Sequence, residues 1–141
     1  MTPTQIEMIR ASWSSVGQIQ DVAATLFYDR LFELDPTVRR LFRRADMAQQ
    51  KKILMQTLTV VVRSLDRLDQ LVPAIEALGR RHAGYGVREE HYDTVGTALL
   101  WTLGQGLGDG FTPELEAAWT DAYTTLASVM IGATEGEAVA A

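Results

Sequence analysis

Apolar residues recur along most of the chain at spacings of three and four, which is the period of an amphipathic α-helix. The first such row begins at Ile6 and ends at Val16, and it predicts a helix over residues 4–16. Thr4 and Glu7 have the spacing of a capping box that would open this helix. Similar rows predict further helical segments over residues 18–34, 35–42, 46–65, 68–81 and 89–107, and a last helix that begins at 112–114. No segment alternates polar and apolar residues convincingly, so the sequence predicts an all-α fold of six to eight helices.

Two stretches of this pattern are ambiguous. Residues 57–62 have strand-like propensity, but the apolar residues from Met47 to Leu65 keep a helical spacing. We therefore predict a helix here, because the spacing of apolar residues indicates which side chains share a buried face. The helix over 68–81 has Pro73 as an alternative start, since proline is favoured in the first turn.

Local chemistry also marks where helices begin and end. Asp35 precedes a proline, Asp46 precedes a long apolar row, and Thr112 precedes Pro-Glu. Asp35 and Thr112 are typical N-caps, because their side-chain oxygens can accept from early backbone N–H groups, and Asp46 is expected to start the long helix. Gly84 and Gly86 are expected to end the helix before them.

Length and composition narrow the class of protein. The 141 residues suit one domain, expected over 1–141 with residues 132–141 as a frayed tail. With 13 Lys and Arg against 18 Asp and Glu, the net charge of −5 argues against nonspecific binding of nucleic acid. The absence of cysteine excludes disulfides, cysteine-ligated iron–sulfur clusters and thiol catalysis. No apolar run approaches the roughly 20 residues of a membrane span, and the N-terminus has no signal-peptide pattern, so we expect a cytoplasmic protein.

His82 is the first candidate for chemistry. It follows Leu71, Ile75 and Leu78 at spacings of four, three and four, so it lies on the apolar stripe of its helix. A histidine there is most often a core residue whose ring bonds to a backbone carbonyl. The alternative is an axial ligand to haem iron, which needs a single protein ligand and commonly takes a neutral imidazole. The sequence contains only one other histidine, His91.

Three further side chains are candidates for a binding pocket, and two of them, Gln50 and Tyr28, are polar groups on otherwise apolar stripes. Gln50 and Leu54 share one helical face, and Tyr28 lies four residues from both Ala24 and Phe32. Each has an ordinary interpretation, as a helix-edge amide, a core leucine and a buried phenol bonded to backbone. The functional interpretation is a pair of hydrogen-bond donors aimed at a small polar ligand, with Leu54 limiting its pocket. Arg81 is most often a solvated charge, although beside a haem it would meet a propionate.

The order of these residues, taken together, resembles the single-domain bacterial globins and the haem domain of flavohaemoglobins, in particular the heat- and acid-tolerant globins with a Tyr/Gln distal pair. The resemblance extends from about Ile6 to Ile131. Six stretches carry it, at residues 26–32, 35–42, 50–56, 78–87, 91–96 and 118–123. Each stretch alone is a weak match to the family pattern, but all six in this order and at these intervals are specific to it. The resemblance implies a 3-on-3 helical sandwich around haem.

The resemblance also implies a role for each candidate residue. The cofactor would be haem b, bound on its proximal side by His82. The ligands would be O2, CO and NO, held by the distal donors Tyr28 and Gln50. The other expected haem contacts are Phe42 stacked on the ring, Leu54 on the distal wall, Val87 on the proximal side, Arg81 at a propionate, and Tyr92 near the proximal imidazole.

Two departures from the family pattern shape the functional expectation. The residues end at 141, without a flavin or nicotinamide domain, so a separate reductase is expected. The glutamate that flavohaemoglobins place late in the last helix falls here on Thr134, with Glu135 one residue further on. We therefore expect an O2-binding globin for storage, delivery or scavenging, as a monomer or weak homodimer. The alternatives are a nitric oxide dioxygenase that uses an external reductase and, last, a haem-free or sensing helical module.

Overall fold

The first helix shows how local chemistry sets the start of an element. In the computed structural model, α1 spans Pro3–Gly17, and Thr2 caps it. The Thr2 hydroxyl accepts from the Gln5 backbone N–H at 3.1 Å, and the Gln5 amide oxygen accepts from the Thr2 N–H at 2.9 Å. The prediction of a capping box at Thr4 and Glu7 was therefore wrong, because the capping box lies two residues earlier, at Thr2 and Gln5. A residue before proline prefers the extended conformation of an N-cap, and proline itself fits the first helical position.

The remaining elements follow the predicted order. The structure describes the backbone of residues 1–140 and the side chains of residues 1–134. The elements after α1 are α2 (Gln20–Leu34), the 3₁₀ helix η1 (Pro36–Phe42), α3 (Met47–Arg63), η2 (Leu65–Arg67), α4 (Leu68–Gly84), α5 (Glu89–Leu107), η3 (Gly108–Gly110) and α6 (Pro113–Ala140). The all-α prediction is confirmed, and the described residues contain no strand. Side chains beyond residue 134 lie outside the described residues, so the expected frayed tail over 132–141 stays a prediction.

The helix that carries His82 is longer than predicted. Helix α4 starts at Leu68, passes through Pro73 and ends at Gly84 instead of Arg81. Its last turn is closed by backbone bonds, because the Tyr85 N–H donates to the carbonyl of residue 81 at 3.1 Å and the Val87 N–H donates to the His82 carbonyl at 3.0 Å. Gly86, with φ of 95°, then turns the chain away.

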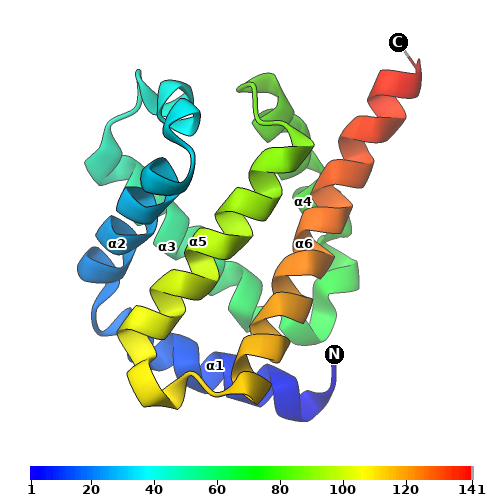
Figure 1. Cartoon of the computed structure of the whole chain (residues 1–141). Helices are drawn as coiled ribbons and strands as arrows, with labels where there is room; N and C mark the ends of the chain where they lie inside the picture. Colours follow the sequence, from blue (N-terminus) through cyan, green and yellow to red (C-terminus); the bar gives the residue numbers. More distant parts are fainter. Residues whose placement is uncertain (141) are drawn as a thin grey trace.

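The helices pack in two crossed layers (Figure 1). Helices α5 and α6 run side by side, α4 packs on α6, and α2 packs on α5 and α3. Helix α1 crosses beneath the lower ends of α5 and α6. The core between them contains Ile9, Leu31 and Leu103, which are almost fully buried, and Trp13 against Trp119 with ring centroids 5.8 Å apart. No helix among the described residues is long and apolar enough to cross a membrane.

One glycine sets the position of α4 on α6. A Cβ atom at Gly79 would lie 2.5 Å from the Met130 carbonyl oxygen, closer than any real contact. The backbones of the two helices therefore meet directly at this point. His82 follows Gly79 by three residues, so this approach fixes where the imidazole stands relative to α6. Sequence analysis did not identify Gly79, although a glycine within a strongly apolar helical row is a signal of close packing.

Candidate functional site

Tyr28 and Gln50 form a hydrogen-bonded pair between α2 and α3. The Gln50 Nε2 donates to the Tyr28 hydroxyl oxygen at 3.2 Å. Tyr28 is 3% exposed, and burial raises its pKa even though the Gln50 bond lowers it. The phenol is thus neutral at physiological pH. Since its oxygen already accepts from Gln50, its own proton remains available for a further acceptor.

Aromatic rings hold Tyr28 in place. Phe27 contacts it edge-on with centroids 5.0 Å apart, and Phe42 does so at 5.5 Å. Phe32 lies 6.0 Å from Tyr28 and 5.6 Å from Phe42, so the three rings form one cluster. The structure therefore brings Phe42, expected as a haem contact, together with Tyr28. Phe32 was foreseen only as a neighbour of Tyr28 on its stripe, and it is the link between η1 and α2.

Leu54 continues the same face of α3 one turn beyond Gln50. It is half-buried and packs against the core, as does Leu58 one turn later. Gln50 is also half-buried. This face of α3 is therefore polar at Gln50 and apolar over the next two turns, at Leu54 and Leu58.

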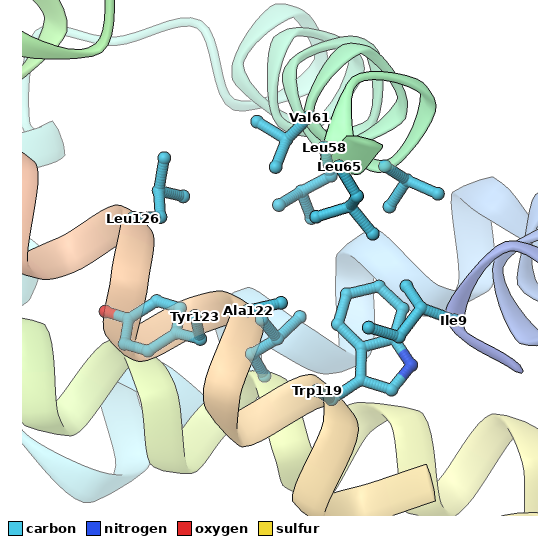
Figure 2. Close-up of a pocket in the computed structure, with 10 residues that line it drawn as sticks. Ile9, Leu58, Val61, Leu65, Trp119, Ala122, Tyr123 and Leu126 are labelled. Atoms are coloured by element: carbon cyan, nitrogen blue, oxygen red, sulfur yellow. The ribbon is translucent and has the colours of Figure 1, made fainter. Parts of the chain in front are cut away.

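A small apolar cavity of about 20 Å³ lies further along α3, deeper in the core. It is lined by Ile9, Leu58, Val61, Val62, Leu65, Leu99, Trp119, Ala122, Tyr123 and Leu126. Figure 2 shows the α3 side chains pointing across it toward Trp119, Ala122 and Tyr123 of α6. None of the site residues predicted from the sequence lines this cavity, so it is a packing defect beside the candidate site.

His82 is placed as an imidazole with a fixed tautomer. Its Nδ1 lies 2.8 Å from the Leu78 carbonyl oxygen, one turn earlier on α4. A carbonyl can only accept, so Nδ1 carries the proton and the lone pair is on Nε2. Burial lowers the pKa of His82, the Leu78 bond raises it, and the Arg81 charge lowers it further. The ring is therefore neutral at pH 7, which is the form that ligates a metal.

Two other residues predicted on the proximal side, Arg81 and Val87, lie close to His82 at the end of α4. The Val87 N–H donates to the His82 carbonyl, and Val87 is half-buried. Arg81 is exposed. The Tyr85 ring centroid lies 6.4 Å from that of His82, and Tyr85 is 66% exposed. Contacts of Val87 and Arg81 with a haem remain expectations.

Tyr92 is joined to α6 by its backbone. The Tyr123 hydroxyl donates to the Tyr92 carbonyl oxygen at 2.6 Å, and burial raises the pKa of both phenols. The Thr134 hydroxyl donates to the Ile131 carbonyl at 2.8 Å, within its own helix. Thr134, which is expected at the position of the flavohaemoglobin glutamate, thus bonds only to its own helix. The Glu135 side chain lies outside the described residues.

The second histidine has a structural role in this arrangement. His91 Nδ1 accepts from the Arg88 backbone N–H at 2.9 Å and so caps the start of α5. A ring engaged in this way is a weaker candidate for iron than His82.

The donor set fits a haem. A neutral imidazole with its lone pair on Nε2 stands on α4, and a protonated phenol supported by an amide joins α2 to α3. Phe42, Leu54 and Val87 add half-buried apolar surface around these groups. Haem requires one strong axial ligand and an apolar pocket with few, well-placed polar groups.

Comparison with known proteins agrees with this assignment. The model of the Globin family matches residues 25–130. The Flavohemoprotein of Bacillus subtilis is 30% identical over 129 residues, which are 90% of this chain and 32% of the relative. That of Rhodopirellula baltica is 36% identical over 108 residues, 75% of this chain and 26% of the relative. Neuroglobin-1 of Oncorhynchus mykiss is 31% identical over 143 residues, covering 92% of this chain and 90% of the relative. The chain thus spans a third or less of those flavohemoproteins.

A solved structure resembles the whole chain. It is a carbene transferase engineered from a candidate nitric oxide dioxygenase of Rhodothermus marinus, with a TM-score of 0.84 and 28% sequence identity. The match covers 99% of this chain and 96% of the other. The resemblance inferred from the six sequence stretches and the predicted 3-on-3 helical sandwich are both confirmed.

Proposed function

The chain belongs to the globin family and its cofactor is haem, and from this premise we propose that it binds O2, and also CO and NO, with His82 as the proximal ligand and Tyr28 and Gln50 as distal donors. The haem supplies the iron that takes the gas. The proposed use is O2 binding for storage, delivery or scavenging. We also propose the cytoplasm as its location, from the sequence, and a monomer or weak homodimer as its state.

One observation carries this proposal, the 3.2 Å bond from Gln50 to the buried phenol of Tyr28. The amide polarises the hydroxyl, and hydrogen bonds in a chain strengthen one another in a low-dielectric site. Tyr28 therefore presents its proton to a ligand held beside it. A neutral hydrogen bond contributes about 0.5–1.5 kcal/mol, so Tyr28 and Gln50 together would slow release of O2 roughly tenfold or more.

On the other side, His82 is prepared by its backbone bond. The Leu78 carbonyl orients the ring and holds the proton on Nδ1, which leaves the lone pair of Nε2 available to bind the iron. A carbonyl is a weaker acceptor than a carboxylate. This imidazole is therefore less electron-rich than one bonded to glutamate, which favours holding O2 over activating it.

The ultraviolet–visible spectrum tests the central claim. Protein reconstituted with haem is expected to show a strong Soret band that shifts with CO after reduction, and a lasting spectrum of the O2-bound protein in air. Failure to take up one haem per chain would return His82, Tyr28 and Gln50 to ordinary core roles and overturn the proposal.

Changing Tyr28→Phe should raise the O2 dissociation rate several-fold to about tenfold, because one donor is lost while the ring packing stays. Stopped-flow displacement of O2 by CO measures this rate. Tyr85→Phe is the matched control, since it removes a phenol from an exposed ring, and its rate should equal that of the parent. An unchanged rate in Tyr28→Phe would remove Tyr28 from the distal bond.

A second candidate function is nitric oxide dioxygenase. It is supported by the flavohemoprotein relatives and by the likeness to the Rhodothermus marinus protein. One O2, one NO and one electron give one nitrate, and a separate reductase would supply the electron. Mixing the O2-bound protein with NO in a stopped-flow instrument should then produce nitrate rapidly and in nearly equal amount. Slow loss of the O2-bound spectrum would leave O2 binding as the function.

A further inference from the structure

The charges of this protein are sharply segregated along the chain. Residues 39–52 and 80–88 contain nine of its 13 Lys and Arg residues but only one of its 18 acids, Asp46. The rest of the chain is correspondingly acidic, and the whole carries a net charge of −5. Solubility alone does not require a cationic region on this acidic protein, because the acidic remainder of the chain already keeps it soluble.

The two cationic segments lie next to each other in the fold. A Cβ atom at Gly86, in the turn after α4, would lie 3.3 Å from the Leu41 side chain of η1. Asp35, just before η1, is close enough to His91 of α5 for the histidine charge to lower the pKa of Asp35. In Figure 1 both η1 and the α4–α5 turn lie at the upper end of the molecule.

Most of the cations of these segments are exposed to solvent. We call seven exposed ones the basic surface, namely Arg39, Arg40, Arg43, Arg44, Lys52, Arg81 and Arg88. The ion pairs found among the described residues lie elsewhere and involve Arg10, Arg30 and Arg67. Arg39 rests over the Phe32 ring at 5.5 Å, which leaves its charge outward. In sequence, the exposed Tyr85 lies between Arg81 and Arg88.

The basic surface comes from the same two segments as residues of the candidate site. Phe42 lies within the first cationic segment and so does Gln50, while His82 lies within the second. A partner that docks here is therefore brought to the residues that hold the haem. Arg and Tyr are also the residue types enriched at the centres of protein interfaces.

We propose that the basic surface is the docking site for an acidic one-electron reductase, a proposal that rests on the haem function above. Each encounter transfers one electron from the reduced partner to ferric iron, which becomes ferrous while the partner is oxidised by one electron. Complementary charge steers such a partner and sets its orientation. A compact acidic protein covers only this surface, whereas an extended polyanion such as a membrane or RNA would also meet the acidic remainder of the chain.

The test uses the haem-loaded protein and a flavodoxin, chosen as an acidic one-electron carrier. Arg40→Glu with Arg44→Glu should weaken binding of oxidised flavodoxin, measured by calorimetry, and lower the bimolecular rate of reduction by reduced flavodoxin, each by about tenfold or more. Added salt should produce the same loss in the parent protein. The matched control, Arg63→Glu with Arg67→Glu, makes the same change in net charge at the far end of α3 and should leave both values within about twofold.

Reduction by photoreduced lumiflavin, which is small and uncharged, separates this proposal from the function on which it rests. All variants should be reduced by lumiflavin at the parent rate. If none of the proteins is reduced, the haem function itself fails. If lumiflavin reduces the proteins but neither the charge reversal nor added salt weakens flavodoxin binding, the docking proposal is wrong. It is also wrong if the reversal abolishes binding to phosphatidylglycerol vesicles or to single-stranded RNA and spares flavodoxin.

Discussion

Two pairs of polar side chains in the core join elements that are far apart in the chain. Trp119 Nε1 donates to the Ser12 hydroxyl at 2.9 Å, and Ser12 in turn donates to the Ile9 carbonyl at 2.7 Å. Trp13 Nε1 donates to Thr59 at 3.0 Å. Each pair fixes the rotation of one helix against another, because an unpaired buried donor is costly. Tyr28 with Gln50 is built in the same way, but it leaves one proton uncommitted, which is what distinguishes a site from a structural contact.

Changing Ser12→Ala should cost about 1–3 kcal/mol of unfolding free energy, because the Trp119 N–H is left buried without an acceptor. Urea denaturation of the apoprotein measures the loss. The control is Ser14→Ala on the same helix, at an exposed position, which should change the free energy by less than about 0.5 kcal/mol. Equal effects of the two substitutions would contradict the assignment of the pair as a structural bond.

At the scale of elements, the close approach of α4 to α6 has the largest consequence for the site. Gly79→Ala would place a methyl group on the Met130 backbone and should cost about 2 kcal/mol or more, despite the better helix propensity of alanine. Because α4 must then move, the haem spectrum of the variant should change as well. Gly84→Ala, where nothing lies within 4 Å, should be within about 1 kcal/mol of the parent. Comparable stability and spectra for both variants would show that α4 does not depend on this contact.

A second junction between elements is pH-dependent. Arg10 of α1 donates to the carbonyls of Val62 and Arg63 at the end of α3 and to the Asp66 carboxylate at 2.8 Å. The Arg10 bond lowers the pKa of Asp66 below its ordinary value of 3.8. The ionised carboxylate therefore stabilises the fold above pH 3.8, and this contribution is lost as the pH falls through the lowered pKa.

Asp66→Asn should accordingly be less stable than the parent near pH 6, and the difference should shrink to nothing in strong acid. Urea denaturation across that range measures it. The same substitution made in an Arg10→Gln background should show a much smaller pH-dependent difference, because the main partner of Asp66 is gone and only the weaker contact with Arg67 remains. A difference that persists in acid would assign the effect to packing instead of charge.

Features of the helices could be predicted from the sequence where they depend on adjacent residues, and could not be predicted where they depend on contacts with distant segments. The caps at Asp35 and Thr112 and the helix start at Asp46 were predicted from two or three adjacent residues, and in the structure all three side chains accept from early backbone N–H groups. Thr2 was missed in favour of Thr4, because the proline between them decides which residue is extended. The role of Gly79 depends on the backbone of α6, about fifty residues away. No local pattern contains that information.

At the scale of the whole molecule, the fold brings together residues that the sequence could only nominate one at a time. The order of helices places Tyr28 against Gln50, 22 residues later, by packing α2 on α3. His82 is separated from both along the chain, and it stands on α4, which packs chiefly on α6. Family resemblance could assign these residues a common site, but spacing could not. A bound haem would join the two helical layers, so its effect should extend to the stability of the whole fold.

Haem should therefore raise the melting temperature of the protein, and most of this rise should depend on His82. A ligand at about a thousand times its dissociation constant adds roughly 4 kcal/mol, which for a chain of this size corresponds to a shift on the order of 10 °C. In His82→Ala most of the shift and the normal Soret spectrum should be lost, because the axial bond is gone. His91→Gln, which removes the imidazole that caps α5, should keep both. A His82→Ala protein that still melts higher with haem and shows the parent spectrum would mean that His91 or another group binds the iron.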